Sequence, residues 1–264
     1  MRRTTASIPL TLAVAVISTG LHAEVQTQTI EYEVNGEPHT GYIAWDDATE
    51  GERPGVLVVH EWWGHGQFVR DQAEKLAGAG YTAMAVDMYG DGKSAEHPEQ
   101  AEAFMKEANS DMEAMKSGFR TAMKRLQAHD TVDPDRIAAQ GYCFGGAVVL
   151  NMARMGMDLD GVVSYHGSLG SPIEAEAGDI TARIQAYTGG ADQFVPAEQV
   201  SGFVQEMHAA DAEYMVKSFP GVQHSFMNPE ADQFAEEFGM PVGYDEEAAN
   251  AAWEGTMRFY EDIF

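Results

Sequence analysis

The sequence is poor in cysteine and in basic residues, and it lacks long apolar runs. Its 264 residues contain one cysteine, Cys143, and 16 Lys and Arg residues against 42 Asp and Glu residues. A single cysteine cannot form an internal disulfide, so its thiol serves either packing or chemistry. The formal net charge of -26 repels phosphate backbones and anionic lipid headgroups. We therefore expect neither a nucleic acid nor a membrane surface as partner, and the composition leaves the oligomeric state open.

One apolar segment lies near the N-terminus and is too short to cross a bilayer. It runs from Ile8 to Ile17, follows arginines at positions 2 and 3, and precedes a small residue, Ala23, at a plausible cleavage point. We interpret residues 1–23 as a secretory signal peptide. The mature chain would then begin near Glu24 with a charge of -28, in an exported protein that is periplasmic or secreted.

No Ser- or Pro-rich linker and no internal repeat divides the rest of the chain, so residues 24–264 are interpreted as one domain. Apolar runs alternate with helical patterns, which predicts an α/β fold with a mostly parallel sheet and helices on both faces. Strands are expected at 27–34, 39–45, 55–60, 81–87, 137–141, 161–165, 184–188 and 214–219. Helices are expected at 68–79, at 96–129 as a broken pair, and after Cys143, Pro196 and Asp245.

Two segments have a distinct pattern. Asn35-Gly36 stands between the first two expected strands, which predicts a hairpin and hence an antiparallel pair at the start of the sheet. The segment from Asn228 to Tyr244 carries two prolines, two glycines and several acids. We expect it to be a surface loop that could border a ligand site or act as a lid.

The lone cysteine lies in the sequence Gly-Tyr-Cys-Phe-Gly-Gly, between an expected strand and an expected helix. This order matches the nucleophile elbow G-x-Nu-x-G with cysteine in place of serine. The turn brings Gly141 and Gly145 against neighbouring backbone and places the thiol over a helix N-terminus, which favours thiolate. By itself the short match is equally compatible with close helix-strand packing.

Residues further along the chain favour the catalytic interpretation. A nucleophile elbow requires an acid and then a histidine, each in a loop after a later strand. Asp192 follows the expected strand that ends at Thr188, and His224 follows the one that ends at Phe219. The order Cys143, Asp192, His224 is therefore the order of a catalytic triad.

The loop after the first buried strand offers further candidates. Glu61 needs a partner, because a carboxylate beside a buried strand is otherwise costly. The backbone N–H groups of Trp62 and Phe144 stand where this kind of site forms an oxyanion hole. His166 follows a strand without a complementary acid, so we expect it to line the pocket. No histidine pair has metal-ligand spacing, and we expect neither a metal nor another cofactor.

These motifs together resemble the dienelactone hydrolases, cysteine members of the α/β-hydrolase superfamily. The resemblance rests on five short motifs in the same order: His60 to Gly64, Asp87 to Tyr89, Gly141 to Gly146, Gly189 to Asp192 and His224 to Phe226. It implies an α/β-hydrolase fold and a Cys143-His224-Asp192 triad. It also implies a catalytic role for Glu61, which would lie close to the thiol and help to generate the thiolate when substrate binds. The amides of Trp62 and Phe144 would form the oxyanion hole.

The sequence departs from this family at two positions. Members hold the substrate carboxylate with two arginines, and the corresponding positions here are Asp91 and Asn228, which cannot pair with a carboxylate. Lys93 is the nearby cation that could substitute, although a solvated loop lysine is the favoured interpretation. The departure leaves the dienelactone substrate in doubt.

We therefore expect a hydrolase that cleaves small esters or lactones through a thioester acyl-enzyme. The substrate pocket is predicted to contain Trp63, Tyr89, Lys93, His166 and Phe226. The alternative is a binding protein that has kept this fold without turnover. A thiol redox role is disfavoured because the chain has no second cysteine to resolve an oxidised thiol.

Overall fold

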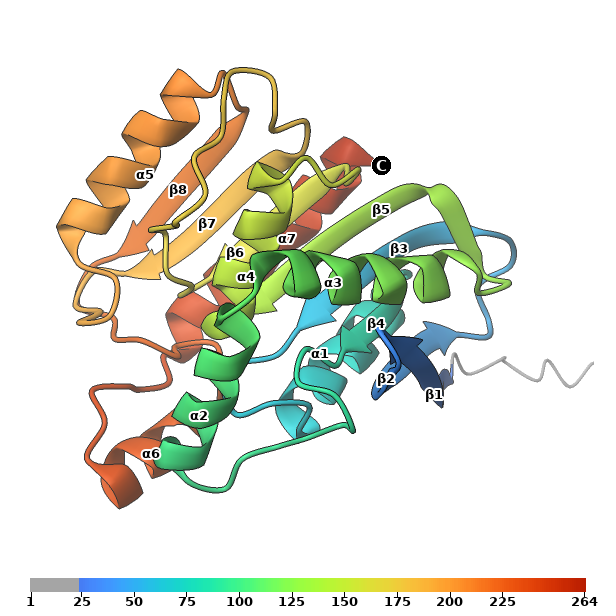
Figure 1. Ribbon diagram of the computed structural model, residues 1–264, viewed down its shortest axis with the longest axis horizontal. Helices are drawn as coiled ribbons and strands as arrows, with labels where there is room; N and C mark the ends of the chain where they lie inside the picture. The colour runs from blue at the N-terminus through green and yellow to red at the C-terminus, as the bar shows by residue number, and fades with distance from the viewer. Residues whose placement is uncertain (1–23) are drawn as a thin grey trace, which may run out of the picture.

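The computed structural model describes residues 24–264, and the predicted signal peptide, residues 1–23, lies outside them. One eight-stranded sheet runs through the molecule in the order β1-β2-β4-β3-β5-β6-β7-β8 (Figure 1). The strands are β1 (Val25–Val34), β2 (Glu37–Asp46), β3 (Arg53–Val59), β4 (Thr82–Val86), β5 (Val132–Tyr142), β6 (Gly161–Tyr165), β7 (Arg183–Gly189) and β8 (Tyr214–Phe219). The helices are α1 (Gln67–Gly78), α2 (Pro98–Asn109), α3 (Met112–Gln127), α4 (Phe144–Arg154), α5 (Ala197–Ala209), α6 (Ala231–Phe238) and α7 (Glu246–Ile263).

The sheet is antiparallel at one end and parallel elsewhere. β1 pairs antiparallel with β2, and β2 pairs antiparallel with β4. Each neighbouring pair from β4 to β8 is parallel. The predicted fold class, a mostly parallel sheet opened by an antiparallel pair, is confirmed. Asn35 and Gly36 form the turn between β1 and β2, and both have the positive φ (53° and 90°) that such a turn requires.

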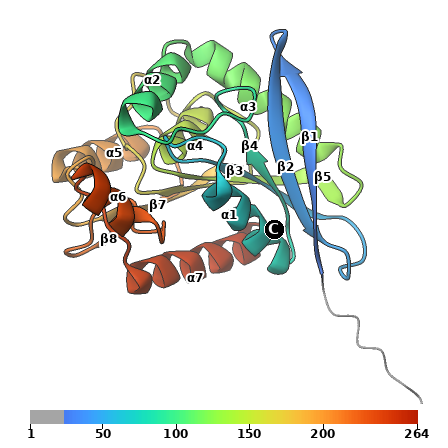
Figure 2. The ribbon, with the colours of Figure 1, turned by 90° about the horizontal axis from the view of Figure 1, so that it is seen from below.

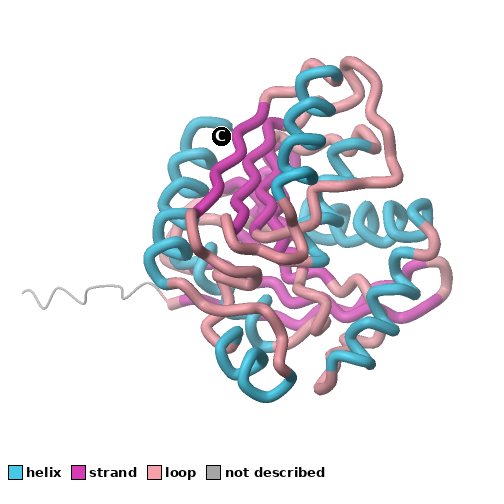
Figure 3. Tube along the Cα trace, turned by 90° about the vertical axis from the view of Figure 1, so that its left-hand side faces the viewer, coloured by secondary structure: helices cyan, strands magenta, loops and turns pink. Residues whose placement is uncertain are grey.

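Helices cover both faces of the sheet (Figure 3). α1 and α7 pack on one face, while α3, α4 and α5 pack on the other (Figure 2). The packing on both faces explains why the central strand β3 is apolar from residue 56 to residue 59. Its residues Val56 and Val58 belong to the core under α1 and α7, whereas Leu57 and Val59 belong to the core under α3 and α4. Between residues 56 and 59 both faces of the strand are buried, so apolar side chains are favoured at each of these positions.

The parallel strands end at the same edge of the sheet, and the loops after them converge there. Glu61 follows β3, Cys143 follows β5, Asp192 follows β7 and His224 follows β8. Residues far apart in the sequence are thereby gathered at one edge, which is where open α/β sheets bind ligands.

Two elements differ from the prediction. β5 begins at Val132 rather than Ile137, because Arg53 and Pro54 pair with Val132 and Asp133 before the register shifts. The segment from Asn228 to Tyr244 is not simply a loop, since it contains α6. Within residues 24–264, no helix has both the length and the apolar character needed to cross a membrane.

Candidate active site

Cys143 lies at a sharp turn between β5 and α4. Its backbone has φ 53° and ψ -113°, a conformation that residues with a side chain rarely adopt and that active sites often contain. The backbone N–H of Cys143 donates to the carbonyl of Tyr165 (3.0 Å) and to Nδ1 of His166 (3.1 Å). The surrounding hydrogen bonds therefore hold the strained turn in place.

Glycine is required at Gly145 because the turn packs directly against β3. A Cβ atom at Gly145 would overlap the carbonyl oxygens of Val59 and His60, and the Gly145 N–H donates to the latter (3.0 Å). This close contact fixes the position of the turn that carries Cys143 relative to the end of β3.

Asp192 and His224 form the acid-histidine pair predicted from the sequence. Nδ1 of His224 donates to Oδ2 of Asp192 at 2.8 Å, and both residues are buried. The other carboxylate oxygen of Asp192 accepts the N–H groups of Phe194 (2.8 Å) and Val195 (3.1 Å). Asp192 is thus held by backbone, and it leaves Nε2 of His224 as the ring nitrogen available for chemistry.

The charge of His224 is set by its neighbours. Burial lowers its pKa, but the nearby Cys143 and the hydrogen bond with Asp192 outweigh burial and raise the pKa to about 10. The ring is therefore positively charged at neutral pH when Cys143 is ionised, as in a thiolate-imidazolium pair.

Cys143 and His224 line a common cavity of about 240 Å³. Its remaining walls come mainly from apolar side chains on seven separate segments. They are Trp62, Met105, Asn109, Phe144, Ala147, Ser168, Phe194, Val195, Ser225 and Met240. No Lys or Arg is among these residues, so among the described residues the protonated ring of His224 is the positive charge that this cavity offers.

Two backbone N–H groups at this cavity are free to bind an oxyanion. Neither Trp62 nor Phe144 donates its N–H to a protein acceptor anywhere in residues 24–264. The loop that carries Trp62 is fixed from behind, because the Tyr89 hydroxyl donates to the Trp62 carbonyl (3.1 Å). Free N–H groups held in place beside a nucleophile are what oxyanion stabilisation requires.

Glu61 is buried next to this site and binds Asn228. Its Oε2 accepts a hydrogen bond of 2.6 Å from Nδ2 of Asn228, while its Oε1 is buried without a partner among the described residues. Burial raises the pKa of Glu61, and the hydrogen bond from Asn228 and the charge of His224 only partly oppose this. Among residues 24–264, Glu61 therefore forms its hydrogen bond with Asn228 and none with Cys143.

The structure corrects the predicted lining of the substrate pocket on the side of the loop after β4. Lys93 is exposed, contacts Asp91 (3.9 Å), and does not line the cavity of Cys143. Tyr89 lies behind the cavity, where its ring packs against Phe144 (5.4 Å between centroids). Trp63 lies in a neighbouring cavity. These residues are close to the site in sequence, but the chain turns them away from it.

His166 and Phe226 are also absent from the cavity lining, because both are buried beneath it. The ring of His166 lies 5.1 Å from that of His224 and 5.2 Å from that of Phe226. Burial holds the pKa of His166 well below its usual value, so the ring is neutral and can accept the Cys143 N–H. Its position indicates a role in holding the turn at Cys143.

Several residues that do line the cavity belong to no motif in the sequence. Met105 and Asn109 belong to α2, Phe194 follows β7, and Met240 follows α6. Their presence depends on how α2 and α6 pack, and a lone methionine in a helix has no motif. Phe194 stands two residues after Asp192 and could have been identified from that position, since its ring lies 4.9 Å from His224.

The acidic and imidazole groups of the site bind each other rather than converging on a metal position. No three His, Cys, Asp or Glu side chains within residues 24–264 gather closely enough to hold a metal ion. Beside Cys143, Asp192 and His224 instead form a hydrogen bond of 2.8 Å with each other.

Comparison with known sequences places the chain among ester-cleaving enzymes. The model of the dienelactone hydrolase family matches residues 40–264. Protein usf of Aquifex pyrophilus is 28% identical over 240 residues, which is 89% of this chain and 98% of that protein. A protein of Aquifex aeolicus with the provisional name carboxymethylenebutenolidase is 27% identical over 239 residues, covering 89% and 97% of the two chains.

Solved structures agree with the sequence comparison. A dienelactone hydrolase-like promiscuous phosphotriesterase from metagenomic libraries superposes with a TM-score of 0.84 at 27% identity, covering 92% of this chain and all of that one. A protein titled m3DLH gives a TM-score of 0.85 at 30% identity, covering 91% and 99% of the two chains. The predicted α/β-hydrolase fold is confirmed by these neighbours.

Proposed function

Because the chain belongs to the dienelactone hydrolase family and is a carboxylic ester hydrolase, we propose that Cys143 is its nucleophile and that it cleaves small uncharged esters or lactones. One observation carries the proposal: Cys143 and His224 line the same cavity, and Asp192 holds the ring of His224 from behind. This is the arrangement of a nucleophile, a base and the group that orients the base.

In the first half-reaction the thiolate of Cys143 attacks the substrate carbonyl carbon. The carbonyl oxygen becomes an oxyanion, which the N–H groups of Trp62 and Phe144 stabilise. When the intermediate collapses, the bond to the alkoxide breaks, and the imidazolium of His224 gives its proton to the departing oxygen. The product is an alcohol, or an open-chain hydroxyl in the case of a lactone, and a thioester on Cys143.

In the second half-reaction water cleaves the thioester. Neutral His224 takes a proton from the water as it attacks, and the oxyanion again faces the two N–H groups. Collapse of the intermediate releases a carboxylic acid and restores the thiolate of Cys143 beside a protonated His224. Asp192 keeps the same ring tautomer through both steps by accepting the Nδ1 proton.

The walls of the cavity favour an uncharged substrate. A volume of about 240 Å³ and apolar side chains such as Trp62, Met105 and Met240 suit a short acyl chain or a small ring. A substrate carboxylate would find no Lys or Arg there, and pairing with the protonated ring of His224 would compete with the place of that ring beside Cys143, so its desolvation cost stays high. The family's dienelactone substrate carries such a carboxylate, so we propose neutral esters and lactones in its place.

The experiment is hydrolysis of p-nitrophenyl acetate, p-nitrophenyl butyrate and γ-lactones by the purified protein. Cys143→Ala is expected to abolish turnover, while Ser168→Ala, a change in the same cavity, should retain most of it. Undiminished turnover by folded Cys143→Ala would disprove the assignment of the nucleophile. A preference for substrates with anionic acyl groups would disprove the assignment of substrate class.

A second activity is supported by one of the structural comparisons. The phosphotriesterase similar to this chain is called promiscuous, and neutral phosphate triesters also suit a mainly apolar cavity without Lys or Arg. We propose that Cys143 attacks such triesters at phosphorus and expels the best leaving group. Paraoxon should release p-nitrophenol from the wild-type protein and not from Cys143→Ala.

We also propose that the protein is exported, on the basis of residues 1–23 alone. Fractionation of expressing cells should recover a chain beginning near Glu24 in the periplasm or medium. An intact N-terminus in the cytoplasmic fraction would disprove this.

A further inference from the structure

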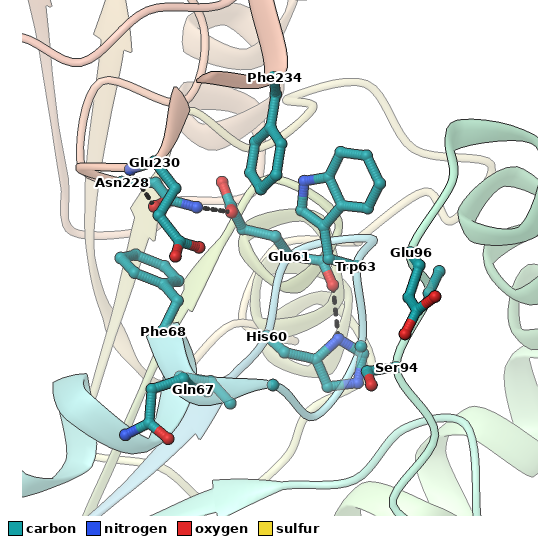
Figure 4. A pocket seen from close by; sticks show the side chains of 14 residues that line it. His60, Glu61, Trp63, Gln67, Phe68, Ser94, Glu96, Asn228, Glu230 and Phe234 are labelled. Atoms are coloured by element: carbon teal, nitrogen blue, oxygen red, sulfur yellow. Dashed lines mark hydrogen bonds between the residues drawn. The ribbon is translucent and has the colours of Figure 1, made fainter. Parts of the chain in front are cut away.

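A second cavity, of about 270 Å³, lies beside the active site and does not contain Cys143 or His224. It is formed by the loop after β3, the start of α1 and the segment that leads into α6 (Figure 4). Nothing in the proposed reaction uses this space.

The charge of the cavity wall is negative. Glu61, Glu96 and Glu230 contribute to the wall, and none of the lining residues is Lys or Arg. His60 also lines it, but burial lowers the pKa of His60 to about 4, so the ring is neutral at pH 7. Its Nδ1–H is already bound to the carbonyl of Glu61 (2.6 Å). The lining residues thus supply no positive charge to these carboxylates, and the charge of His224 acts on Glu61 only from outside this cavity.

The inner end of the cavity holds an unsatisfied acceptor. Glu61 is 3% exposed, and its Oε1 has no hydrogen-bond partner among residues 24–264. Its Oε2 is bound to the neutral amide of Asn228, which supplies a hydrogen bond without a charge. Figure 4 shows this carboxylate between Asn228 and the ring of Phe234. A buried carboxylate oxygen without a partner is costly, which points to an occupant that satisfies it.

Aromatic side chains form much of the remaining wall. Trp63, Phe68 and Phe234 all line the cavity, and the rings of Trp63 and Phe234 pack against each other with centroids 4.5 Å apart. Aromatic faces attract cations, and several faces beside a carboxylate are a recurring arrangement for quaternary ammonium groups.

A metal ion does not fit this wall. A metal needs several ligand atoms converging at about 2.0–2.6 Å, and no three acidic, imidazole or thiol side chains in residues 24–264 come that close together. The three carboxylates are spread around a space lined by rings, so the occupant must be larger than a single ion and partly apolar.

We propose that this cavity binds a small organic cation, an alkylammonium or quaternary ammonium group, with Glu61 at its inner end, Glu230 at its rim and the three aromatic rings around it. Glu230 is placed for this by its own backbone N–H, which donates to Oδ1 of Asn228 (2.9 Å). Cys143 does not line this cavity, so binding there can be tested apart from the proposed nucleophile.

The test is calorimetric titration of the purified protein with tetramethylammonium, and with tert-butanol as an uncharged molecule of similar shape. Tetramethylammonium is expected to bind saturably, and tert-butanol at least about tenfold more weakly. Absence of saturable binding would overturn the proposal. Equal binding of the two molecules would also overturn it, since the cavity would then select for shape rather than charge.

Variants locate the site. Glu230→Gln and Phe234→Leu should each weaken tetramethylammonium binding about fivefold, because one removes a charge and the other removes an aromatic face while keeping apolar bulk. Glu236→Gln is the matched control, as Glu236 lies on the same helix, α6, and does not line the cavity. If Glu236→Gln weakened tetramethylammonium binding as much as Glu230→Gln does, only the overall charge would matter, and the proposed site would be wrong.

The result can be separated from the proposed function. Cys143→Ala should bind tetramethylammonium with unchanged affinity even though it lacks turnover. Loss of binding in folded Cys143→Ala would place the cation in the catalytic cavity and overturn this assignment.

Discussion

Nδ1 of His224 donates a hydrogen bond of 2.8 Å to Oδ2 of Asp192, and the second oxygen of Asp192 is held by two backbone N–H groups. The carboxylate therefore cannot rotate away from the histidine without breaking three hydrogen bonds. One tautomer of His224 is selected, with Nε2 left toward the cavity of Cys143.

Asp192→Asn is expected to lower kcat/KM for p-nitrophenyl butyrate by about 10³- to 10⁴-fold, because the amide can present a donor to Nδ1 and favour the wrong tautomer. Steady-state kinetics measures this. Asp158→Asn, at an exposed position outside the site, should leave kcat/KM unchanged. A loss of less than about tenfold in Asp192→Asn would show that the ring does not depend on this carboxylate.

The raised pKa of His224 depends on Cys143. Cys143→Ala removes the thiolate, so the pKa of His224 should fall from about 10, as followed by NMR titration of its ring proton. Ser168→Ala, in the same cavity, should leave the pKa of His224 unchanged. The stability that the charged ring contributes is complete below 6.5, the unfolded value, and is lost as pH rises through about 10. An identical titration in wild type and Cys143→Ala would contradict the pairing.

Glu61 should make the fold less stable as pH rises. Burial raises its pKa above 4.5, so the folded chain holds this proton more tightly than the unfolded chain does. From pH 4.5 upward, wild-type stability is lost until the raised pKa is passed, and Glu61→Gln removes this dependence. Urea unfolding should show that Glu61→Gln raises the free energy of unfolding above that of the wild type by more at about pH 8 than at about pH 4. Glu236→Gln, at an exposed position, is the control and should differ from the wild type in free energy of unfolding by the same amount at both pH values. A pH-independent difference for Glu61→Gln as well would contradict the prediction.

Gly145→Ala should destabilise the protein by about 1–3 kcal/mol or prevent folding, because the new methyl group meets the carbonyl oxygens of Val59 and His60. Gly202→Ala is the control: it lies in α5 with open space around it and should stabilise by about 0.5–1 kcal/mol. Thermal unfolding distinguishes the two. Equal melting temperatures would show that the turn at Cys143 can move away from β3.

The gathering of the proposed catalytic residues could be predicted from the sequence, because the topology of the sheet brings them together. Once the strands are parallel, the residue after each strand lies at the same edge, so Cys143, Asp192 and His224 need only appear at strand ends in the right order. No long-range packing has to be known for that prediction.

The substrate cavity could not be predicted in this way. Met105 lies on α2 and Met240 follows α6, and their places depend on contacts between segments that no local pattern encodes. The sequence pattern did not reveal α6 itself, because prolines and glycines flank it. Its apolar residues Phe234 and Phe238 are spaced four apart and pack on Trp63, and that partner lies more than 160 residues earlier in the sequence.

The close contact between Gly145 and β3 separates two properties of this enzyme, the reaction and the choice of substrate. The residues that we propose to perform the reaction follow strand ends, and at Gly145 even one added methyl group is excluded. The residues that we propose to select the substrate include those on α2 and on the segment after α6, away from that close contact. Selection can therefore change substrate range through Met105, Asn109 and Met240 while the reaction stays the same, so engineering of new substrates should begin at these three side chains.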